Sequence, residues 1–247
     1  MPRRGTTEGP LVVVGVNPVL ELLRSGDPVL RLLVGPGPRA EEVAAAARAR
    51  GVAPARADRE ELARLAGGPH HQGVVALMPP FTYAPLERLT APGCASALVL
   101  DGIQDPRNLG AILRTARAAG VGGVVLPRDR SAGVTPTVVA ASAGLLFGLP
   151  IARVANLVRA MEALKQAGYW LIGLAAGAAQ DVFTQEVPPR PALVVGGEGA
   201  GLRSLVRRAC DFEVGIPMAP GVDSLNAAVA AGIALYEVLV RRAERRS

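Results

Sequence analysis

The chain has 247 residues, 50% of them hydrophobic, so it can bury a substantial core, which argues against an intrinsically disordered protein. Its 27 Lys and Arg outnumber 21 Asp and Glu, and the net charge of +6 favours a polyanionic partner such as nucleic acid, although a basic soluble enzyme would have the same balance. The two cysteines, Cys94 and Cys210, lie too far apart to suggest a disulfide scaffold or a zinc site.

The first third of the chain predicts a small α/β domain. A polar tail, residues 1–9, is expected to be flexible, and residues 10–78 are expected to fold as one unit. A proline-rich stretch, residues 79–94, is typical of a stiff linker. The apolar pattern predicts strands at 11–14, 30–34 and 73–78, a helix that Asn17-Pro18 opens, and helices at 40–50 and 60–65.

Residues 95–247 predict a larger α/β domain. Strands and helices alternate regularly, and the strands are continuously apolar, which is typical of a parallel sheet with helices on both faces. The expected strands are 97–100, 121–126, 151–154, 169–174, 192–196 and 212–216, and the expected helices are 109–119, 136–147, 156–167, 201–209 and 224–243.

The pattern predicts neither export nor membrane insertion. No apolar segment of signal-peptide length follows Met1, and the two distant cysteines fit a reducing compartment, so we expect the cytoplasm. The uncharged stretch 134–152 is nearly long enough to span a membrane, but Pro136, Gly148 and Pro150 interrupt it. It is interpreted as buried core.

Three loops after predicted strands are the candidate ligand sites, because ligands of open α/β sheets bind beyond the carboxyl ends of the strands. These loops are 101–108, 196–201 and 217–226. The loop Gly196-Gly197-Glu198-Gly199-Ala200-Gly201 matches neither the Walker A nor the Rossmann pattern. Glu198 would repel a pyrophosphate but suits ribose hydroxyls, an ammonium or a sulfonium, while the alternative is a tight turn that merely needs glycine.

Four polar residues near these loops have both a functional and a structural interpretation. Asn108 stands before a predicted helix as a candidate N-cap, and Arg114 follows six residues later, either facing the same pocket mouth or as an ordinary surface arginine. Ser224 and Asn226 open the last predicted helix, again as caps or as ligand-binding residues.

The histidines predict no catalytic or metal site. His70 and His71 are adjacent, so on a strand they would face opposite ways, and no third histidine exists. A Ser-His-Asp triad cannot be built in the second domain, and no metal is expected.

Three segments together resemble the motifs of the SpoU/TrmH family of RNA ribose methyltransferases. Gly15-Val16-Asn17-Pro18 with His70-His71-Gln72-Gly73, and Ser142 to Val154, are also similar to this family, and the combination points to its RlmB-like branch. The three segments are Asp105 to Ala116, Gly196 to Leu202, and Ile216-Pro217-Met218 with Ser224-Leu225-Asn226. After Asn226 the chain has Ala227-Ala228-Val229, where relatives often carry Val and Ser.

This resemblance implies a SPOUT-type catalytic domain with a deep trefoil knot, preceded by an RNA-binding domain similar to small ribosomal proteins. It implies S-adenosylmethionine as cofactor, a homodimer that completes each site, and a guanosine of 23S rRNA in the peptidyl-transferase region as target. The implied catalytic residues are Asn108, Arg114, Glu198, Ser224 and Asn226. The implied cofactor-binding residues are Gly196, Gly197, Glu198, Gly199, Gly201, Ile216, Pro217, Met218, Ser224, Leu225 and Asn226.

Arg114 and Asn108 are expected to organise the ribose and its phosphate. A guanidinium holds its proton too tightly to be a good general base, so we expect Arg114 to act electrostatically on the hydroxyl. Two other functions stay open: a ribose methyltransferase for tRNA or for an antibiotic-resistance site in rRNA, and an RNA-binding ribosome-assembly protein with an inactive methyltransferase fold. The intact Asn108, Arg114, Glu198 and Asn226 argue against the second of these.

Overall fold

The computed structural model describes residues 9–197, 199 and 201–240, and its contacts divide the chain into two units. The first unit comprises residues 1–82 and 134–148, and the second comprises residues 83–133 and 149–247. Residues 1–8 of the expected tail, Glu198, Ala200 and residues 241–247 lie outside the described residues.

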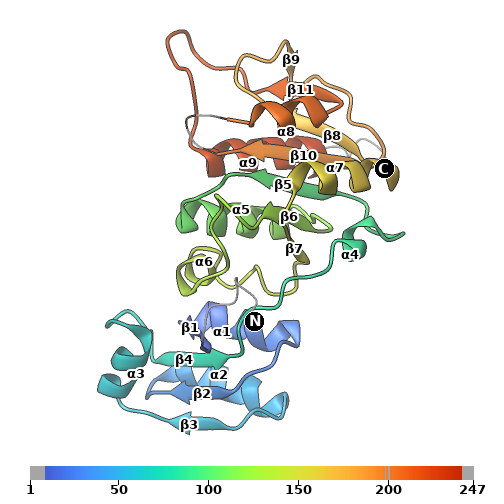
Figure 1. The fold of residues 1–247 in the computed structure, drawn as a ribbon. Helices are drawn as coiled ribbons and strands as arrows, with labels where there is room; N and C mark the ends of the chain where they lie inside the picture. The colour runs from blue at the N-terminus through green and yellow to red at the C-terminus, as the bar shows by residue number, and fades with distance from the viewer. Residues whose placement is uncertain (1–8, 198, 200, 241–247) are drawn as a thin grey trace. The chain divides into compact units, whose positions relative to one another are not determined.

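The first unit is built on a four-stranded sheet of order β1-β4-β2-β3 (Figure 1). β4 pairs antiparallel with β1 and β2, and β2 pairs parallel with β3. Helices α1 and α2 pack together and against the sheet, while Leu62 of α3 packs on Leu33 and Val75. The elements are β1 (Leu11–Val14), α1 (Val16–Ser25), β2 (Arg31–Val34), α2 (Pro38–Ala49), β3 (Pro54–Arg56), α3 (Arg59–Ala66), β4 (Val74–Met78) and α6 (Pro136–Ala141).

The second unit is built on a seven-stranded sheet of order β7-β6-β5-β10-β8-β11-β9, in which every pair of neighbouring strands is parallel. This confirms the predicted parallel sheet. Its elements are α4 (Glu87–Thr90), β5 (Ala97–Asp101), α5 (Pro106–Ala118), β6 (Val124–Pro127), β7 (Ile151–Val154), α7 (Leu157–Gln166), β8 (Trp170–Leu174), β9 (Gln180–Asp181), β10 (Pro191–Gly196), α8 (Ser204–Ala209), β11 (Phe212–Gly215), α9 (Ala227–Leu235) and the π-helical turn η1 (Tyr236–Val240).

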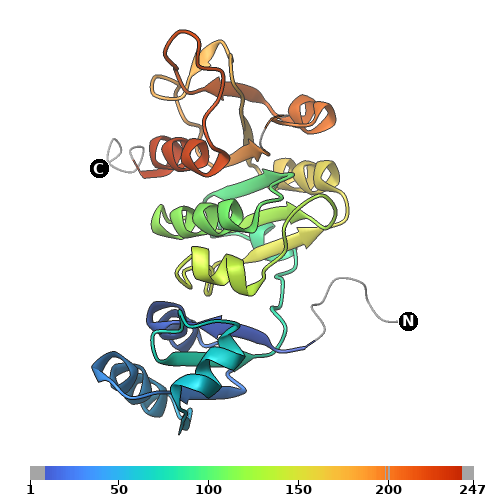
Figure 2. The same ribbon diagram turned by 90° about the vertical axis from the view of Figure 1, so that its left-hand side faces the viewer.

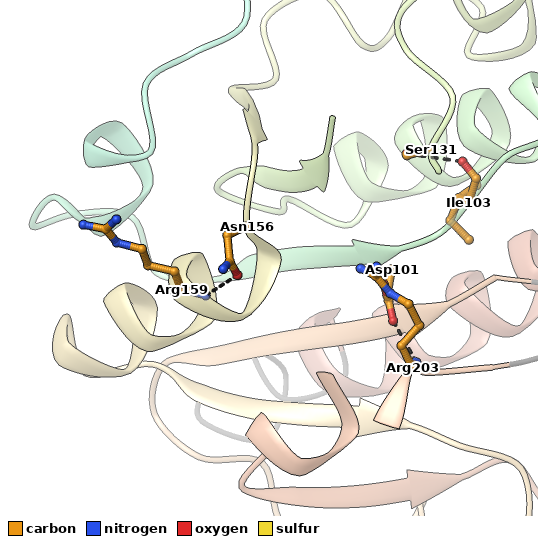
Figure 3. Close-up of polar contacts among 6 residues, drawn as sticks. All are labelled: Asp101, Ile103, Ser131, Asn156, Arg159 and Arg203. Atoms are coloured by element: carbon orange, nitrogen blue, oxygen red, sulfur yellow. Dashed lines mark hydrogen bonds and ion pairs between the residues drawn. The ribbon is translucent and has the colours of Figure 1, made fainter. Parts of the chain in front are cut away.

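Helices cover both faces of this sheet. Figure 2 shows α5 and α9 on one face and α7 and α8 on the other. Beneath α7, Met161 and Leu164 pack on strand residues Val99, Val125 and Val194, all of which are buried. The helix begins at Asn156, whose side chain accepts the N–H of Arg159 (Figure 3). Strands buried on both faces explain why their sequences are continuously apolar.

Several predicted boundaries were wrong for local reasons. Asp105, not Asn108, is the N-cap of α5, because its side chain accepts the N–H of Arg107 and Pro106 follows as the first helical residue. The expected helix 136–147 ends at Ala141, since Ala143 and Gly144 adopt positive φ angles of 53° and 81°. The expected helix 224–243 begins only at Ala227, and its residues 241–243 lie outside the described part.

Three short elements escaped prediction, namely β3, α4 and β9. His70 and His71 lie in the turn before β4 rather than on a strand. His71 is buried, and its Nδ1 accepts the N–H of Gly73 at 3.0 Å, so its role is local. Within the described residues, no helix is long and apolar enough to cross a membrane.

Candidate active site

A cavity of about 610 Å³ lies at the carboxyl ends of β8, β10 and β11, where ligands of parallel sheets are expected. The segments that follow these three strands and the start of α9 form its walls. The lining residues are Leu174, Ala175, Ala176, Val195, Gly196, Gly197, Gly199, Gly201, Leu202, Arg207, Ile216, Met218, Asp223, Ser224, Leu225, Asn226, Ala227 and Ala230.

The glycines after β10 are required by close backbone packing. A Cβ atom on Gly196 would lie 2.2 Å from the carbonyl carbon of Gly201, and one on Gly197 would lie 2.4 Å from the carbonyl oxygen of Gly102. The Gly201 N–H donates to the Gly197 carbonyl at 3.2 Å, which closes the loop. The tight-turn interpretation of these glycines and their place on the cavity wall are therefore compatible.

The last residue of β5, Asp101, is bound to the residues that follow this loop. It is 1% exposed, and its carboxylate accepts the main-chain N–H of Arg203 at 2.8 Å and the Arg203 Nε at 2.6 Å (Figure 3). The Arg203 Nη2 lies 2.6 Å from the same carboxylate. The end of β5 is therefore joined to the residue before α8 by an ion pair whose carboxylate is buried and whose arginine side chain is 43% exposed.

Asn226 connects two of the loops that the sequence singled out. Its Oδ1 accepts the N–H groups of Ala228 and Val229 at 2.9 and 3.3 Å, so it is the N-cap of α9. Its Nδ2 donates to the Oδ1 of Asn108 in the first turn of α5, at 3.1 Å, across 118 residues of sequence. One amide therefore caps a helix and joins α5 to the cavity.

The structure places the other predicted residues unevenly. Ser224, Leu225, Ile216 and Met218 line the cavity together with the predicted glycines. Pro217 lines a neighbouring cavity of about 580 Å³ instead. Asn108 meets the site through Asn226, whereas Arg114 is exposed on α5 and is not among the lining residues. Glu198 lies outside the described residues.

Residues 174–176, Asp223 and Arg207 line the cavity although sequence reasoning did not select them. The residues at the end of β8 could have been predicted as a ligand site, because they follow the carboxyl end of another strand that is predicted to be parallel. Nothing in its composition, Leu174-Ala175-Ala176, distinguishes it from a buried strand end.

Arg207 brings a positive charge to the cavity wall but is paired with Glu213 of β11. The Arg207 Nη2 lies 2.5 Å from Glu213 Oε2, and the second nitrogen, Nε, binds Oε1. Hydrogen bonding to Arg207 lowers the pKa of Glu213, and the same contact raises the pKa of Arg207. The pair therefore stays charged at neutral pH. Among the described residues, no group of three His, Cys, Asp or Glu side chains could hold a metal ion.

Residues 95–236 match the model of the SpoU rRNA methylase family, and residues 12–84 match a model described as RNA 2′-O ribose methyltransferase substrate binding. The chain belongs to the SpoU rRNA methylase family. The expected family, enzyme class and cofactor are thereby confirmed: the chain is an S-adenosylmethionine-dependent RNA methyltransferase.

Full-length relatives agree with this membership. A Staphylococcus aureus (strain MSSA476) protein described as a TrmH-family tRNA/rRNA methyltransferase is 39% identical to this chain over 239 residues. The match covers 94% of this chain and 96% of the relative. YacO of Bacillus subtilis (strain 168), assigned likewise, is 39% identical over 238 residues, 93% of this chain and 95% of YacO.

Solved SpoU-family structures have the same fold. The SpoU methyltransferase AviRb from Streptomyces viridochromogenes, in complex with AdoMet, has a TM-score of 0.80 at 32% identity, with 96% of this chain and 92% of AviRb covered. An AdoMet-bound rRNA methyltransferase from Sinorhizobium meliloti has a TM-score of 0.80 at 30% identity, with coverages of 95% and 87%.

Proposed function

We propose that this methyltransferase modifies a ribose 2′-hydroxyl of 23S rRNA, on a guanosine in the peptidyl-transferase region. The observation that carries the proposal is the convergence of two loops, 196–201 and 216–226, on one cavity, with Asn226 of the second loop hydrogen-bonded to Asn108. A protein that only binds RNA does not need a cavity of this size at the strand ends.

The cavity fits S-adenosylmethionine in size and chemistry. Its volume of about 610 Å³ falls within the roughly 300–1,000 Å³ usual for small-molecule sites. Leu174, Ile216 and Leu225 supply apolar wall, and Gly196, Gly197, Gly199 and Gly201 line the cavity with main-chain atoms alone. We assign the predicted cofactor-binding residues to this cavity, including Glu198, which belongs to the same loop, and Pro217, which lines the neighbouring cavity between the lining residues Ile216 and Met218.

When bound, S-adenosylmethionine supplies an electrophilic methyl group on a sulfonium sulfur. In the reaction the ribose O2′ would lose its proton to solvent and receive the methyl group, leaving the sulfur as a neutral thioether. We assign to Arg114 the electrostatic stabilisation of the developing negative charge on O2′, and to Asn108 the orientation of the ribose and its phosphate. Glu198, Ser224 and Asn226 shape the pocket.

A homodimer completes each site in this proposal. Arg114 does not line the cavity of its own chain, so we assign it to the cavity of a second copy. Val229 on α9 and Tyr236, seven residues later at the start of η1, are large apolar side chains exposed to solvent, as is Leu225 just before α9. Such a stripe supports a contact with a second copy, because soluble proteins seldom leave apolar stripes uncovered.

Ribosomal RNA is favoured over tRNA by the first unit. Residues 12–84 match a substrate-binding model, and a separate domain of this kind supports recognition of a large RNA. Methylation of tRNA, or of an rRNA site that confers antibiotic resistance, is the alternative. The trefoil knot, the RlmB-like branch, the cytoplasmic location and the domain limits at 78 and 94 stay predictions.

The function is tested by incubating the purified protein with 23S rRNA and methyl-labelled S-adenosylmethionine. We expect label on one ribose of 23S rRNA, and mapping of alkali-resistant linkages locates it. Arg114→Ala should reduce transfer at least about a hundredfold, since a general electrostatic contribution of this kind is worth that much, with cofactor affinity unchanged. Label on tRNA alone contradicts the proposed substrate.

Two controls sharpen this experiment. Arg117→Ala removes another exposed arginine of α5, and we expect full activity. Mixing Arg114→Ala with Asn226→Ala chains should restore part of the activity, because a mixed dimer has one intact cavity beside one intact arginine. If the mixture stays inactive while each variant dimerises, Arg114 does not act across the dimer.

A further inference from the structure

Asp101 holds a buried charge that the proposed mechanism does not use. It is the last residue of β5 and 1% exposed, and both oxygens of its carboxylate are bound: Oδ2 by the main-chain N–H of Arg203, and Oδ1 by the Arg203 guanidinium (Figure 3). A buried carboxylate costs several kcal/mol of desolvation unless such partners compensate for it. The arrangement therefore calls for a function that justifies a charge at this place.

The backbone of Asp101 binds the other end of the same segment. Its carbonyl oxygen accepts the N–H of Gly197 at 2.9 Å, while its side chain binds Arg203. One residue therefore fixes both ends of the stretch 197–203. Between these ends the Gly201 N–H bonds to the Gly197 carbonyl, and Gly197, Gly199, Gly201 and Leu202 line the cavity.

A glycine-rich stretch needs such fixation. Gly199 and Gly201 have φ angles of 80° and 61°, a region that glycine enters without steric cost but also leaves easily. Glycine gains more freedom than any other residue when a segment opens, so a wall built from glycine is loose unless its ends are held. Asp101 and Arg203 are themselves not among the lining residues, so they act on the cavity through this segment.

We propose that Asp101 is a positioning residue for S-adenosylmethionine, which holds segment 197–203 in the binding conformation with Arg203 as its counter-ion. The inference rests on the proposed function, since it requires that the cofactor occupies this cavity. Loss of the carboxylate charge releases the Arg203 side chain and one end of the segment. Part of the free energy of S-adenosylmethionine binding must then restore the binding conformation, so the affinity falls.

The test is Asp101→Asn, which keeps the side-chain shape and removes the charge. We expect the Kd for S-adenosylmethionine, measured by calorimetry well below the unfolding temperature, to rise at least about tenfold. Amide hydrogen exchange should become faster in peptides that cover residues 197–203. If the ion pair had only a structural role, Asp101→Asn would lower the unfolding temperature but change neither the cofactor Kd nor the amide exchange of residues 197–203.

Asp211→Asn is the matched control. Asp211 also accepts a main-chain N–H, that of Leu171 at 2.7 Å, and also binds a cation, Lys165 Nζ at 2.7 Å, yet neither partner lines the cavity. We expect this variant to lose a similar ion pair while its cofactor Kd and the exchange of residues 197–203 stay those of the wild type.

Arg203→Ala keeps the inference testable should Asp101→Asn fail to fold. Its side chain is 43% exposed, and the variant retains the main-chain bond to Asp101. We expect a raised Kd, with partial recovery in Arg203→Lys because the positive charge returns. Wild-type Kd and exchange in both Asp101→Asn and Arg203→Ala overturn the inference, whereas a wild-type protein that binds no cofactor contradicts the proposed function instead.

Discussion

Cys210 lies behind α8, with its sulfur 3.5 Å from the carbonyl oxygen of Val206 and next to Gly173 of β8. Burial raises the pKa of its thiol to about 12, and the negative charge of Glu213 adds to the shift. Because the folded-state pKa is raised, the neutral thiol is the stable form at every pH below about 12. The thiolate, which is the reactive species, is therefore scarce in the folded protein.

We predict that Cys210 resists alkylation in the native protein at pH 8. With a pKa of about 12, only about one thiol in ten thousand is ionised at that pH, compared with roughly a quarter in an unfolded chain, where the pKa is about 8.5. Iodoacetamide treatment followed by peptide mass spectrometry measures the label on Cys210 separately from Cys94. Labelling of native Cys210 as fast as in urea would show the prediction to be wrong.

For the individual site residues, the sequence predicts which of them lie near a helix start but not which of them hydrogen-bond to one another. Asn226 and Ser224 were placed at a helix start because Asn and Ser are favoured caps, and Asn226 is the cap of α9. Of the two interpretations of Asn108, the cap is wrong, since Asp105 caps α5 and Pro106 is its first residue. The bond between Asn108 and Asn226 spans 118 residues, and no local pattern contains it.

Among the elements, the loop after β10 is the one most sensitive to added volume. Gly196→Ala introduces a Cβ atom within 2.2–2.5 Å of the backbone of Gly201 and Leu202, which cannot rotate away as a side chain could. We predict a loss of about 1–3 kcal/mol in the free energy of unfolding, measured with denaturant, together with weakened cofactor binding.

Gly168→Ala provides the comparison for this variant. Gly168 has a φ angle of 86° at the end of α7, and a Cβ atom there meets nothing within 4 Å. This substitution adds only the backbone strain of about 1–2 kcal/mol expected for a left-handed position, and cofactor binding should be unaffected. Equal cofactor affinity in the two variants would show that the packing of Gly196 does not shape the cavity.

Element prediction succeeded where the apolar period was long and failed where it was short. The strands β1 and β7 and the helix α7 were found to within a residue or so, since each shows several buried positions in register. β3 and β9, of three and two residues, are too short to show any period. The early end of α6 depends on the positive φ of Ala143, which the residue type does not indicate.

Within the second unit, Tyr169 and Arg190 hold the stretch 89–94 against the segments that precede β8 and β10. The buried Tyr169 hydroxyl lies 2.7 and 2.8 Å from the carbonyl oxygens of Leu89 and Cys94, and its burial raises the pKa of the phenol. The Arg190 guanidinium stacks on the Tyr169 ring and donates to the carbonyls of Ala91, Cys94 and Ala167.

We predict that Tyr169→Phe lowers the free energy of unfolding by about 1–3 kcal/mol, because it leaves a buried carbonyl oxygen without its donor. Thr184→Val removes an exposed hydroxyl that donates to the Asp181 carbonyl at 3.4 Å, so it should leave the free energy nearly unchanged and serves as the control. Thermal or urea unfolding monitored by circular dichroism compares the two. Equal stabilities of the two variants would show that the Tyr169 hydroxyl does not stabilise the stretch 89–94.

The strand order lay beyond what periodicity could predict. Apolar runs identify strands and favour parallel pairing, but they do not say which strands are neighbours. In the sheet, β10 pairs with β5 in a register that places Ala192 beside Ala97, 95 residues earlier, and it pairs with β8 on its other side. Neither the apolar pattern nor the family resemblance supplied a strand order.

The central position of β10 has a consequence for how the protein is made. While a ribosome is still synthesising residues 191–196, both β5 and β8 lack their shared neighbour and present unpaired edges. Pairing across such long sequence separations is slow, so the nascent chain spends this interval open to aggregation. Chaperone demand should therefore be concentrated late in translation, and truncated products that stop before β10 should be found in inclusion bodies or degraded.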